Sequence, residues 1–471
     1  MFKKILIANR GEIAVRIVRA CAEMGIRSVA VYTEADQYAL HVKRADEAHS
    51  LGSDPLAGYL NPHHIVNLAV ETGCDAIHPG YGFLSENAEL ARICAERGIV
   101  FIGPSAEVIR RMGDKTEARR AMIAAGVPVT PGSEGNLATV EDALGEAARI
   151  GYPVMLKATS GGGGRGIRRC DNEGELKRNY DRVISEATKA FGNADVFLEK
   201  CIVNPRHIEV QVLADGHGNT IHLFERDCSV QRRNQKLIEI APSPQLTREQ
   251  RAYVGELSVR AAEAVGYVNA GTVEFLLAGN QVYFMEMNTR VQVEHTITEQ
   301  ITGVDIVREQ IRIAAGLPLG YRQQDISYRG YALQLRINAE DPKNNFLPSF
   351  GHISRYYAPG GPGVRVDTAI YTGYDIPPYF DSMCLKLIVW SLQWEEALNR
   401  AERALNDMRL QGIKTTAPYY RQILKHPDFR AGSFDTSFVD QHPELLEYSE
   451  RSRPEDIALA IAAAIAAHAG L

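Results

Sequence analysis

The stretch Phe284-Met-Glu-Met-Asn-Thr-Arg-Val-Gln-Val-Glu-His295 alternates polar and apolar residues over most of its length. Its polar positions are Glu286, Asn288, Arg290, Gln292 and Glu294. Alternation with a period of two predicts an extended chain that presents these five side chains on one face. Eight extended residues span about 26 Å, at roughly 3.3 Å per residue. That length is too great for one reaction centre, so we expect the chain to bend near Arg290.

The polar residues of this stretch have the chemistry of a binding site. A carboxylate followed two residues later by an amide, as in Glu286 and Asn288, suits a hard cation such as Mg²⁺. Arg290 and the second carboxylate, Glu294, suit an anion that has a proton to lose. The alternative is a half-solvated edge strand, which is disfavoured because Asn is a poor strand former.

Composition restricts the class of protein. The 471 residues are too many for one hydrophobic core, which predicts two or more domains. The net charge of -6 argues against a nucleic-acid partner, and we find neither a signal peptide nor a membrane-length apolar run. The seven cysteines are scattered and never spaced as Cys-x-x-Cys, which favours reduced thiols. We therefore expect a cytoplasmic protein with no nucleic-acid or membrane partner.

Strand and helix patterns alternate along the first part of the chain. Residues 3–8 form an apolar run typical of a buried strand, residues 12–24 have helical spacing, and a second strand pattern begins at Ser28. The alternation continues for about 110 residues and predicts a doubly wound α/β domain. The Gly-x-Gly-x-x-Gly fingerprint is missing after the first strand, so NAD binding is not predicted.

Turn-forming residues and changes of pattern divide the rest of the chain. They predict a protein of α/β and α+β class, with a helical linker and a terminal helix that is either a docking element or a simple end. The predicted segments are an N-terminal α/β domain (1–114), a helical linker (115–130), a small lid (131–203), a mixed α+β domain (204–447) and an Ala-rich tail helix (448–471).

A glycine loop at residues 161–166 lies between two strand patterns in the predicted lid. A Walker loop would be followed by Lys-Ser/Thr and a helix, whereas this loop suits a flexible cover over phosphates. Gly162, Gly163 and Gly164 leave backbone N–H groups open to phosphate oxygens, and Lys157 precedes the loop as a point charge. The alternative is a flexible hairpin tip. A strand ending in Glu199 and Lys200 can bind an adenine edge through its backbone, although an ordinary strand end has the same pattern.

A β-hairpin is predicted over residues 271–286, leading into the opening stretch. With a three-residue loop, Gly279–Gln281, Glu274 lies directly opposite Glu286. With a two-residue loop it would oppose Met285, and the two carboxylates would face opposite ways. A metal site requires the first register.

Together these features resemble the ATP-grasp ligases, and specifically the biotin carboxylases, over about residues 1–447. The resemblance implies an ATP-grasp fold in which the glycine-loop lid is mobile. Besides the glycine loop, it rests on motifs in the same order: Ile7-Ala-Asn-Arg-Gly-Glu-Ile-Ala, His78-Pro-Gly-Tyr-Gly-Phe-Leu-Ser-Glu-Asn, Met112-Gly-Asp-Lys, Asn204-Pro-Arg-His-Ile-Glu, Glu225-Arg-Asp-Cys-Ser-Val-Gln-Arg-Arg, the stretch 286–295 and Arg336-Ile-Asn-Ala-Glu-Asp.

The resemblance implies a role for each matching residue. The implied ATP-binding residues are Lys115, Lys157, Gly162, Gly163, Gly164, Glu199, Lys200, Ile202, His207, Gln231 and Asn234. The implied ligands of Mg²⁺ (or Mn²⁺) are Glu274, Glu286 and Asn288, and bicarbonate is implied to bind Lys236, Arg290, Gln292, Val293 and Glu294. Glu294 is implied to be the base, and Arg336 to stabilise the biotin enolate; with Lys236 and Arg290 they form the implied catalytic set.

Two positions depart from the family pattern. Many members have His where this chain has Asn234, which puts one nucleotide contact in doubt, although Asn still donates one hydrogen bond. Residues 239–242, Glu-Ile-Ala-Pro, replace a more usual double-acid version. Lys236 is retained, so the implied activity stands: ATP- and bicarbonate-dependent carboxylation of biotin through carboxyphosphate.

The resemblance also implies partners. The Met-Lys-Met tripeptide of biotin-bearing domains is absent, so we expect biotin on a separate carrier or carboxyltransferase subunit. Segments after residue 320 resemble the biotin carboxylase subunit of two-subunit pyruvate carboxylases, with acetyl-CoA carboxylase as the alternative parent complex. More remote alternatives are an ATP-grasp ligase acting on an amine or carboxylate, which would not need the Arg290 to Glu294 constellation, and a non-catalytic scaffold, which should have lost a metal ligand.

A charged stripe on the first predicted helix bears on assembly. Arg16, Arg19 and Glu23 lie at i, i+3 and i+7, on one helix face. The simplest interpretation is a solvated face. The resemblance instead places this stripe at the two-fold interface of biotin carboxylase dimers, which predicts a homodimer.

Overall fold

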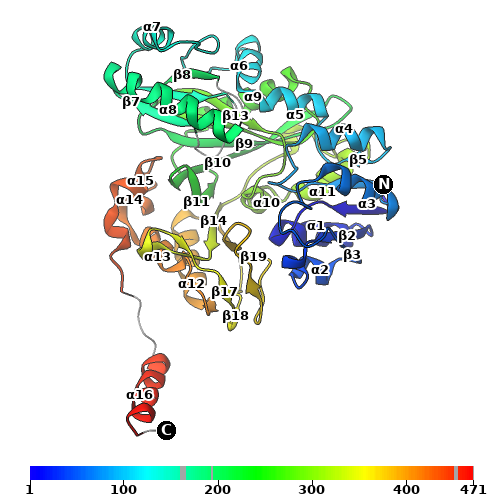
Figure 1. Cartoon of the computed structure of the whole chain (residues 1–471), viewed down its shortest axis with the longest axis vertical. Helices are drawn as coiled ribbons and strands as arrows, with labels where there is room; N and C mark the ends of the chain where they lie inside the picture. The colour runs from blue at the N-terminus through cyan, green and yellow to red at the C-terminus, as the bar shows by residue number, and fades with distance from the viewer. Residues whose placement is uncertain (160–165, 192–194, 450–453, 470–471) are drawn as a thin grey trace.

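Three β-sheets organise the computed structural model, which describes residues 1–159, 166–191, 195–449 and 454–469 (Figure 1). A parallel sheet lies in the N-terminal part, a small antiparallel sheet in the lid, and an eight-stranded antiparallel sheet in the remainder. Helices cover these sheets, and the tail helix α16 (Pro454–Ala469) stands apart from them (Figure 1).

The N-terminal sheet has the strand order β3-β2-β1-β4-β5 and is parallel throughout. Alternate residues of β1 pack on opposite sides: Ile5 and Ile7 join a core with helix α1, and Leu6 joins a second core with α3 and α4. Both faces are therefore covered, which confirms the doubly wound prediction. The elements are β1 (Lys4–Ile7), α1 (Gly11–Glu23), β2 (Arg27–Tyr32), α2 (Leu40–Arg44), β3 (Glu47–Ser50), α3 (Pro62–Glu71), β4 (Ala76–His78), α4 (Ala88–Glu96), β5 (Val100–Phe101) and α5 (Ala106–Gly113).

Helix α6 (Lys115–Ala124) is capped by Asp114, whose side chain accepts hydrogen bonds from two backbone N–H groups of the first turn. The lid that follows is a three-stranded sheet, β7-β6-β8, packed on two helices through its own apolar core. Strands β6 and β7 pair on either side of the glycine loop, as the strand-loop-strand pattern predicts. Gly162, Gly163 and Gly164 lie outside the described residues. The lid elements are α7 (Val140–Ile150), β6 (Val154–Ala158), β7 (Ile167–Cys170), α8 (Glu173–Phe191) and β8 (Val196–Lys200).

The large sheet has the order β13-β12-β9-β10-β11-β14-β21-β19. Its strands are β9 (Arg206–Ala214), β10 (Thr220–Arg232), β11 (Gln235–Ala241), β12 (Asn269–Ala278), β13 (Gln281–Asn288), β14 (Tyr331–Asn338), β19 (Val364–Thr368) and β21 (Met383–Ser391). The helices of this part are α9 (Arg248–Ala264), α10 (His295–Thr302), α11 (Ile306–Ala314), α12 (Trp394–Asp407), α13 (Ala417–Lys425), α14 (Pro427–Arg430) and α15 (Phe438–Gln441). Short strand pairs are β15 (Glu340–Asp341) with β16 (Leu347–Pro348), β17 (Gly351–His352) with β20 (Asp375–Ile376), and β18 (Arg355–Tyr357) with β22 (Arg409–Gln411).

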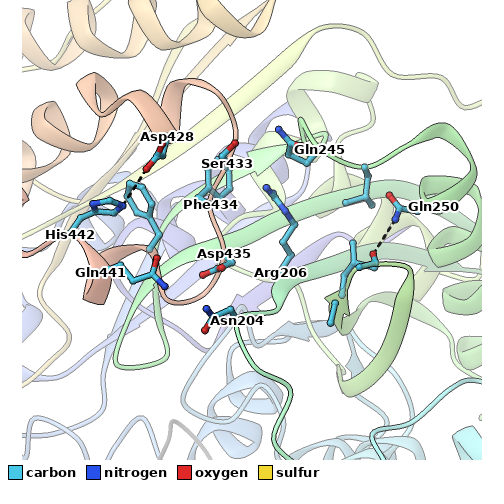
Figure 2. Close-up of a pocket in the computed structure, with 15 residues that line it drawn as sticks. Asn204, Arg206, Gln245, Gln250, Asp428, Ser433, Phe434, Asp435, Gln441 and His442 are labelled. Atoms are coloured by element: carbon cyan, nitrogen blue, oxygen red, sulfur yellow. Dashed lines mark hydrogen bonds and ion pairs between the residues drawn. The ribbon is translucent and has the colours of Figure 1, made fainter.

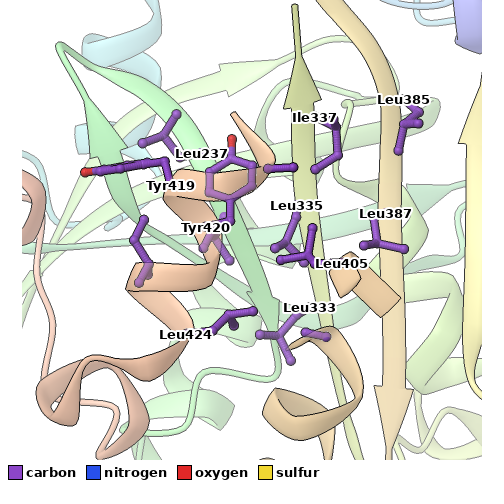
Figure 3. Close-up of a cluster of buried hydrophobic side chains, with 14 of the residues drawn as sticks. Leu237, Leu333, Leu335, Ile337, Leu385, Leu387, Leu405, Tyr419, Tyr420 and Leu424 are labelled. Atoms are coloured by element: carbon purple, nitrogen blue, oxygen red, sulfur yellow. The ribbon is translucent and has the colours of Figure 1, made fainter. Parts of the chain in front are cut away.

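One apolar core anchors the C-terminal half of this sheet (Figure 3). Leu333, Leu335 and Ile337 alternate along β14 and face α12 and α13, where Leu405 and Tyr420 are fully buried. This packing fixes β14, and with it the polar residue Arg336 on the opposite face of the strand.

The opening stretch is extended only as far as Asn288. The chain bends at Thr289 and Arg290 and turns into α10, so the predicted bend is confirmed. The prediction of one continuous polar face up to Glu294 is wrong, because the chain leaves the sheet edge before Gln292.

The hairpin reaches the register that a metal site requires by an unpredicted route. Ala278 pairs with Gln281, so the loop has two residues rather than three. A β-bulge between Phe275 and Glu274 then takes up one extra residue, and Glu274 pairs directly with Glu286.

The tail helix α16 is apolar around most of its surface. Leu459, Ile461 and Ile465 are 72%, 55% and 64% exposed. No helix among the described residues combines the length and apolar character needed to cross a membrane. An apolar helix without a covering surface is typical of an element that docks on a partner.

Candidate active site

Three glutamates lie in a row across neighbouring strands of the large sheet. Glu209 on β9 pairs with Glu274 on β12, which pairs with Glu286 on β13. Like charges directly opposite one another destabilise a sheet unless cations lie between them. Arg226, fully buried on β10, lies opposite Glu209 and donates to it at 2.5 Å. The row is therefore built to hold positive charge.

Lys236 on β11 is the centre of this arrangement. Its Nζ donates to Glu209 Oε2 at 2.5 Å, to Glu274 Oε1 at 3.0 Å and to Glu294 Oε1 at 2.7 Å. Burial opposes the charged form, but the three carboxylates outweigh it and raise the pKa of Lys236 well above its usual range. The amine is therefore a fixed cation at the point where the strands converge.

Glu274 is buried and accepts four hydrogen bonds. His207 donates to Oε2 at 2.7 Å; Lys236, Asn288 and Gln292 donate to Oε1 at 3.0, 2.9 and 2.6 Å. Burial would raise the pKa of Glu274, yet Lys236 and His207 hold it well below the usual value. This carboxylate stays ionised.

Glu286 differs because it is exposed to solvent. Although the residue is exposed, desolvation of its carboxylate by the surrounding protein raises the pKa of Glu286. The negative charge of Glu274 raises this pKa further. Glu274, Glu286 and the amide oxygen of Asn288 form a hard, oxygen-only donor set that fits Mg²⁺. In this structure that amide oxygen accepts from Arg290 Nη2 at 2.9 Å.

Glu294 precedes helix α10 and is 1% exposed. Its second oxygen accepts from Arg336 Nη2 at 3.0 Å. Burial opposes ionisation, but Lys236 and Arg336 hold the pKa of Glu294 far below its usual range. Arg336 is fixed in turn by Glu239, whose Oε1 accepts from Arg336 Nε at 2.5 Å. The change at residues 239–242 therefore keeps the carboxylate that positions Arg336.

The other predicted bicarbonate residues lie around the bend. Arg290 Nε donates to Glu86 at 3.0 Å, and Gln292 bridges Glu274 and the buried Arg226. The carbonyl of Val293 accepts from Lys386 Nζ at 3.0 Å. Lys236, Gln292 and Glu294 thus meet closely, whereas Arg290 reaches the N-terminal domain.

The predicted ATP residues are divided among α6, the lid and the large sheet. Lys157 Nζ donates to Glu199 at 2.5 Å. Burial lowers the pKa of Lys115, and the negative charge of neighbouring Glu286 partly offsets this decrease. The Lys200 side chain instead donates to the carbonyls of Gly151 and Tyr152, and its backbone N–H donates to Pro131. These bonds engage the side chain and the N–H of Lys200, and its contact with nucleotide stays a prediction.

Gln231 and Asn234 lie at the β10–β11 hairpin, while Ile202 follows β8. The two-residue turn of the β10–β11 hairpin consists of Arg233 and Asn234, with φ of +50° and +63°. Asn tolerates this left-handed region better than most residues, which is a backbone reason for Asn at this position.

Several residues of the site were missed from the sequence. They are Glu86, Glu209, Arg226 and Glu239, each of which positions a predicted residue. A signal existed for Glu209, because His207, Glu209 and Gln211 alternate with apolar residues as the opening stretch does. Arg226 lies in the quoted motif that begins at Glu225, but no alternation around it indicated a role.

Family models match nearly the whole chain. "Biotin carboxylase, N-terminal domain" matches residues 1–109, "Carbamoyl-phosphate synthase L chain, ATP binding domain" matches 114–322, and "Biotin carboxylase C-terminal domain" matches 334–441. The chain belongs to the biotin carboxylase family. The predicted fold class is confirmed, and with it the use of ATP and Mg²⁺ and a biotin substrate held on a carrier. Use of Mn²⁺ stays a prediction.

Relatives of this biotin carboxylase belong to different parent enzymes. The chain is 57% identical to the 2-oxoglutarate carboxylase small subunit of Hydrogenobacter thermophilus, over 100% of both chains. It is 52% identical to a pyruvate carboxylase subunit of Methanothermobacter thermautotrophicus, over 94% of this chain and 90% of the relative. A crystal structure of the H. thermophilus biotin carboxylase domain dimer with MgADP, ADP and bicarbonate is 58% identical, covers 96% of this chain and 100% of its own, and superposes with a TM-score of 0.93.

Proposed function

We propose that this biotin carboxylase supplies carboxybiotin to a pyruvate carboxylase, as its first half-reaction. The observation that supports the chemistry is the convergence of Lys236, Glu294 and Arg336 beside the paired carboxylates Glu274 and Glu286. This geometry offers cations for an anion and a carboxylate next to them. A non-catalytic scaffold is disfavoured, because all three predicted metal ligands are present.

In the first step, bicarbonate attacks the γ-phosphate of ATP and gives carboxyphosphate and ADP. Lys115 and Lys157 hold the phosphates, while Glu199, His207, Gln231, Asn234, the backbone near Ile202 and the glycine loop complete the nucleotide site. Mg²⁺, held by Glu274, Glu286 and Asn288, neutralises phosphate charge during the transfer. Arg290, Gln292 and Val293 orient bicarbonate beside Lys236.

Glu294 removes the proton from bicarbonate. Its low pKa in this structure depends on Lys236 and Arg336, so it becomes a stronger base when Lys236 turns toward the bound anion. In the second step carboxyphosphate breaks down to CO₂ and phosphate. The phosphate takes the proton of the biotin ureido nitrogen, Arg336 stabilises the resulting enolate, and that nitrogen attacks CO₂ to form carboxybiotin. The lid closes over the site and keeps water from the intermediate.

The acceptor of the parent enzyme decides the product. Pyruvate is our first proposal, supported by the resemblance after residue 320 and by the similarity to the M. thermautotrophicus pyruvate carboxylase chain. 2-Oxoglutarate is the second candidate, because the match to the 2-oxoglutarate carboxylase small subunit runs over both chains in full, including the tail. Acetyl-CoA remains the third. We also propose that α16 helps to dock the biotin-carrying subunit, and that the protein is cytoplasmic.

Reconstitution tests the half-reaction. The chain alone, with ATP, Mg²⁺, bicarbonate and pyruvate, is expected to hydrolyse ATP slowly, to respond to free biotin and to make no oxaloacetate. Addition of the co-purified biotin-carrying subunit should produce oxaloacetate from pyruvate, with 2-oxoglutarate and acetyl-CoA as parallel acceptors. Oxaloacetate production by the isolated chain would refute the proposal that it catalyses only the first half-reaction. A carboxylated product from 2-oxoglutarate or acetyl-CoA, and none from pyruvate, would identify that compound as the acceptor.

We also propose that the chain forms a homodimer through the charged stripe on α1. Arg16 is buried in ion pairs with Glu299 and Asp305, so the simplest view of a solvated stripe is wrong for this residue, whereas Arg19 and Glu23 are exposed. A cavity of about 320 Å³ lies beside them. Arg19→Glu is expected to raise the dimer dissociation constant at least about 10-fold, or about 1.4 kcal/mol, in sedimentation experiments. Arg97 is exposed away from this stripe, so Arg97→Glu should leave the dissociation constant unchanged. Equal effects of the two substitutions on the dissociation constant would contradict a dimer interface at the α1 stripe.

A further inference from the structure

Two histidines and two carboxylates meet near the end of the large domain. His426 precedes α14, Asp428 lies in its first turn, and His442 and Glu444 follow α15. Asp428 and His442 line one end of a cavity of about 430 Å³ (Figure 2). The arrangement lies on the other face of the large sheet from the chemistry above, because Arg206 lines the same cavity while its neighbour His207 faces the opposite side of β9.

Glu444 orients both imidazole rings. Its Oε1 lies 2.8 Å from His442 Nδ1 and 3.6 Å from His426 Nε2. A carboxylate at these nitrogens favours the tautomers with Nδ1–H on His442 and Nε2–H on His426. The backbone N–H of Asp428 donates to His426 Nδ1 at 3.3 Å, which agrees with a lone pair on that nitrogen.

The two remaining ring nitrogens, His442 Nε2 and His426 Nδ1, then face one oxygen, and a bound ion would replace the long 3.3 Å bond that His426 Nδ1 accepts from the Asp428 N–H. Asp428 Oδ2 lies 3.6 Å from His442 Nε2 and 4.0 Å from His426 Nδ1. Lone pairs facing a carboxylate repel one another unless a cation lies between them. One potential ligand atom from each of His426, Asp428 and His442 lies within 4.8 Å of the other two.

We propose that His426, Asp428 and His442 bind one transition-metal ion, for which Zn²⁺ is the natural probe. Metal–ligand bonds of about 2.0–2.2 Å at a tetrahedral ion place ligand atoms roughly 3.4 Å apart, close to the separations from Asp428. Two imidazoles and a carboxylate suit Zn²⁺ or Co²⁺ better than Mg²⁺.

Glu444 completes the site as the outer carboxylate that orients ligand histidines in metal sites. Phe438 is buried and contacts both imidazole rings, edge-on to His426 and tilted against His442, and the two imidazole centroids are 4.1 Å apart, so both rings are held in place. Asp428 is exposed, which leaves the fourth coordination position open to water or to a ligand in the cavity.

Calorimetric titration of the chelator-treated full chain with Zn²⁺ tests the site. We expect one saturable equivalent that is lost in His442→Ala and Asp428→Asn, because each removes one of the three ligands. Glu444→Gln should weaken it about 10- to 100-fold, as loss of an outer carboxylate does. Cobalt(II) at the same site should give the visible absorption of a four-coordinate ion, and Zn²⁺ should raise the melting temperature.

His352→Ala is the matched control, because His352 is exposed and pairs with a single carboxylate, Asp375, at 2.9 Å. It should retain the full equivalent. Bicarbonate-dependent ATP hydrolysis should persist in His442→Ala, which separates this site from the active-site carboxylates. Absence of saturable binding in the wild type, or equal stoichiometry and affinity in wild type and His442→Ala, would overturn the proposal.

Discussion

Glu286→Gln is expected to abolish bicarbonate-dependent ATP hydrolysis while the fold remains intact. The substitution removes an anionic oxygen from the donor set for Mg²⁺ and keeps the shape of the side chain. The measurement is the steady-state rate of ADP formation across a Mg²⁺ titration. Because Glu286 lies beside the ionised Glu274, loss of its charge relieves repulsion, and the melting temperature should not fall.

Glu256→Gln is a suitable control for this variant. Glu256 is exposed on α9 and undergoes the same chemical change away from the site. It should have wild-type activity. Near-normal hydrolysis by Glu286→Gln would show that the carboxylate is not a metal ligand.

Loss of Glu294 is expected to have the second largest effect. Glu294→Ala should lower the rate of biotin carboxylation roughly 10²-fold or more, the usual scale for a general base. Carboxylation of free biotin at saturating ATP measures this rate, and the KM for ATP should change little. A variant with weaker ATP binding and normal turnover would make Glu294 a binding residue.

A structural explanation must be separated from a catalytic one. Removal of Glu294 leaves Lys236 and Arg336 without one buried partner, a change that costs about 3–5 kcal/mol in other proteins. Glu294→Gln keeps the volume, and its circular dichroism and melting temperature report whether the fold survives. Glu209→Gln removes a different carboxylate from Lys236, so an equal loss of turnover in both variants would indicate that only the charge on Lys236 matters.

Local periodicity predicted the parts of the site that lie within one element. Glu286 and Asn288 share a face because they are two residues apart on β13, and their chemistry was readable from the sequence. The strands around the glycine loop were predicted for the same reason. The hairpin was harder, because a two-residue loop and a bulge together give the register that a three-residue loop alone would give. The bulge compensates for the shorter loop, and neither feature can be recognised from the hydrophobic pattern of the sequence.

Positions that depend on several strands were not predictable in this way. Lys236 is 38 residues from Glu274 and 58 from Glu294 along the chain, yet bonds to both. Its family motif implied a role, but nothing near it indicated that Glu209 would share its amine. Arg226 lies in a quoted motif that gave it no role, and it donates five hydrogen bonds to acceptors in four separate segments.

The sequence by itself determined the family, the doubly wound start, the hairpin with its carboxylates and the bend after Asn288. Each follows from a short motif or from a period that a few neighbouring residues define. The tertiary structure decided which charges meet: the row of Glu209, Glu274 and Glu286, the convergence on Lys236, and the histidine cluster beside α14. The physical reason is that alternation along one strand sets the face of a side chain, whereas its neighbours across the sheet depend on strand order, which burial of the whole core selects.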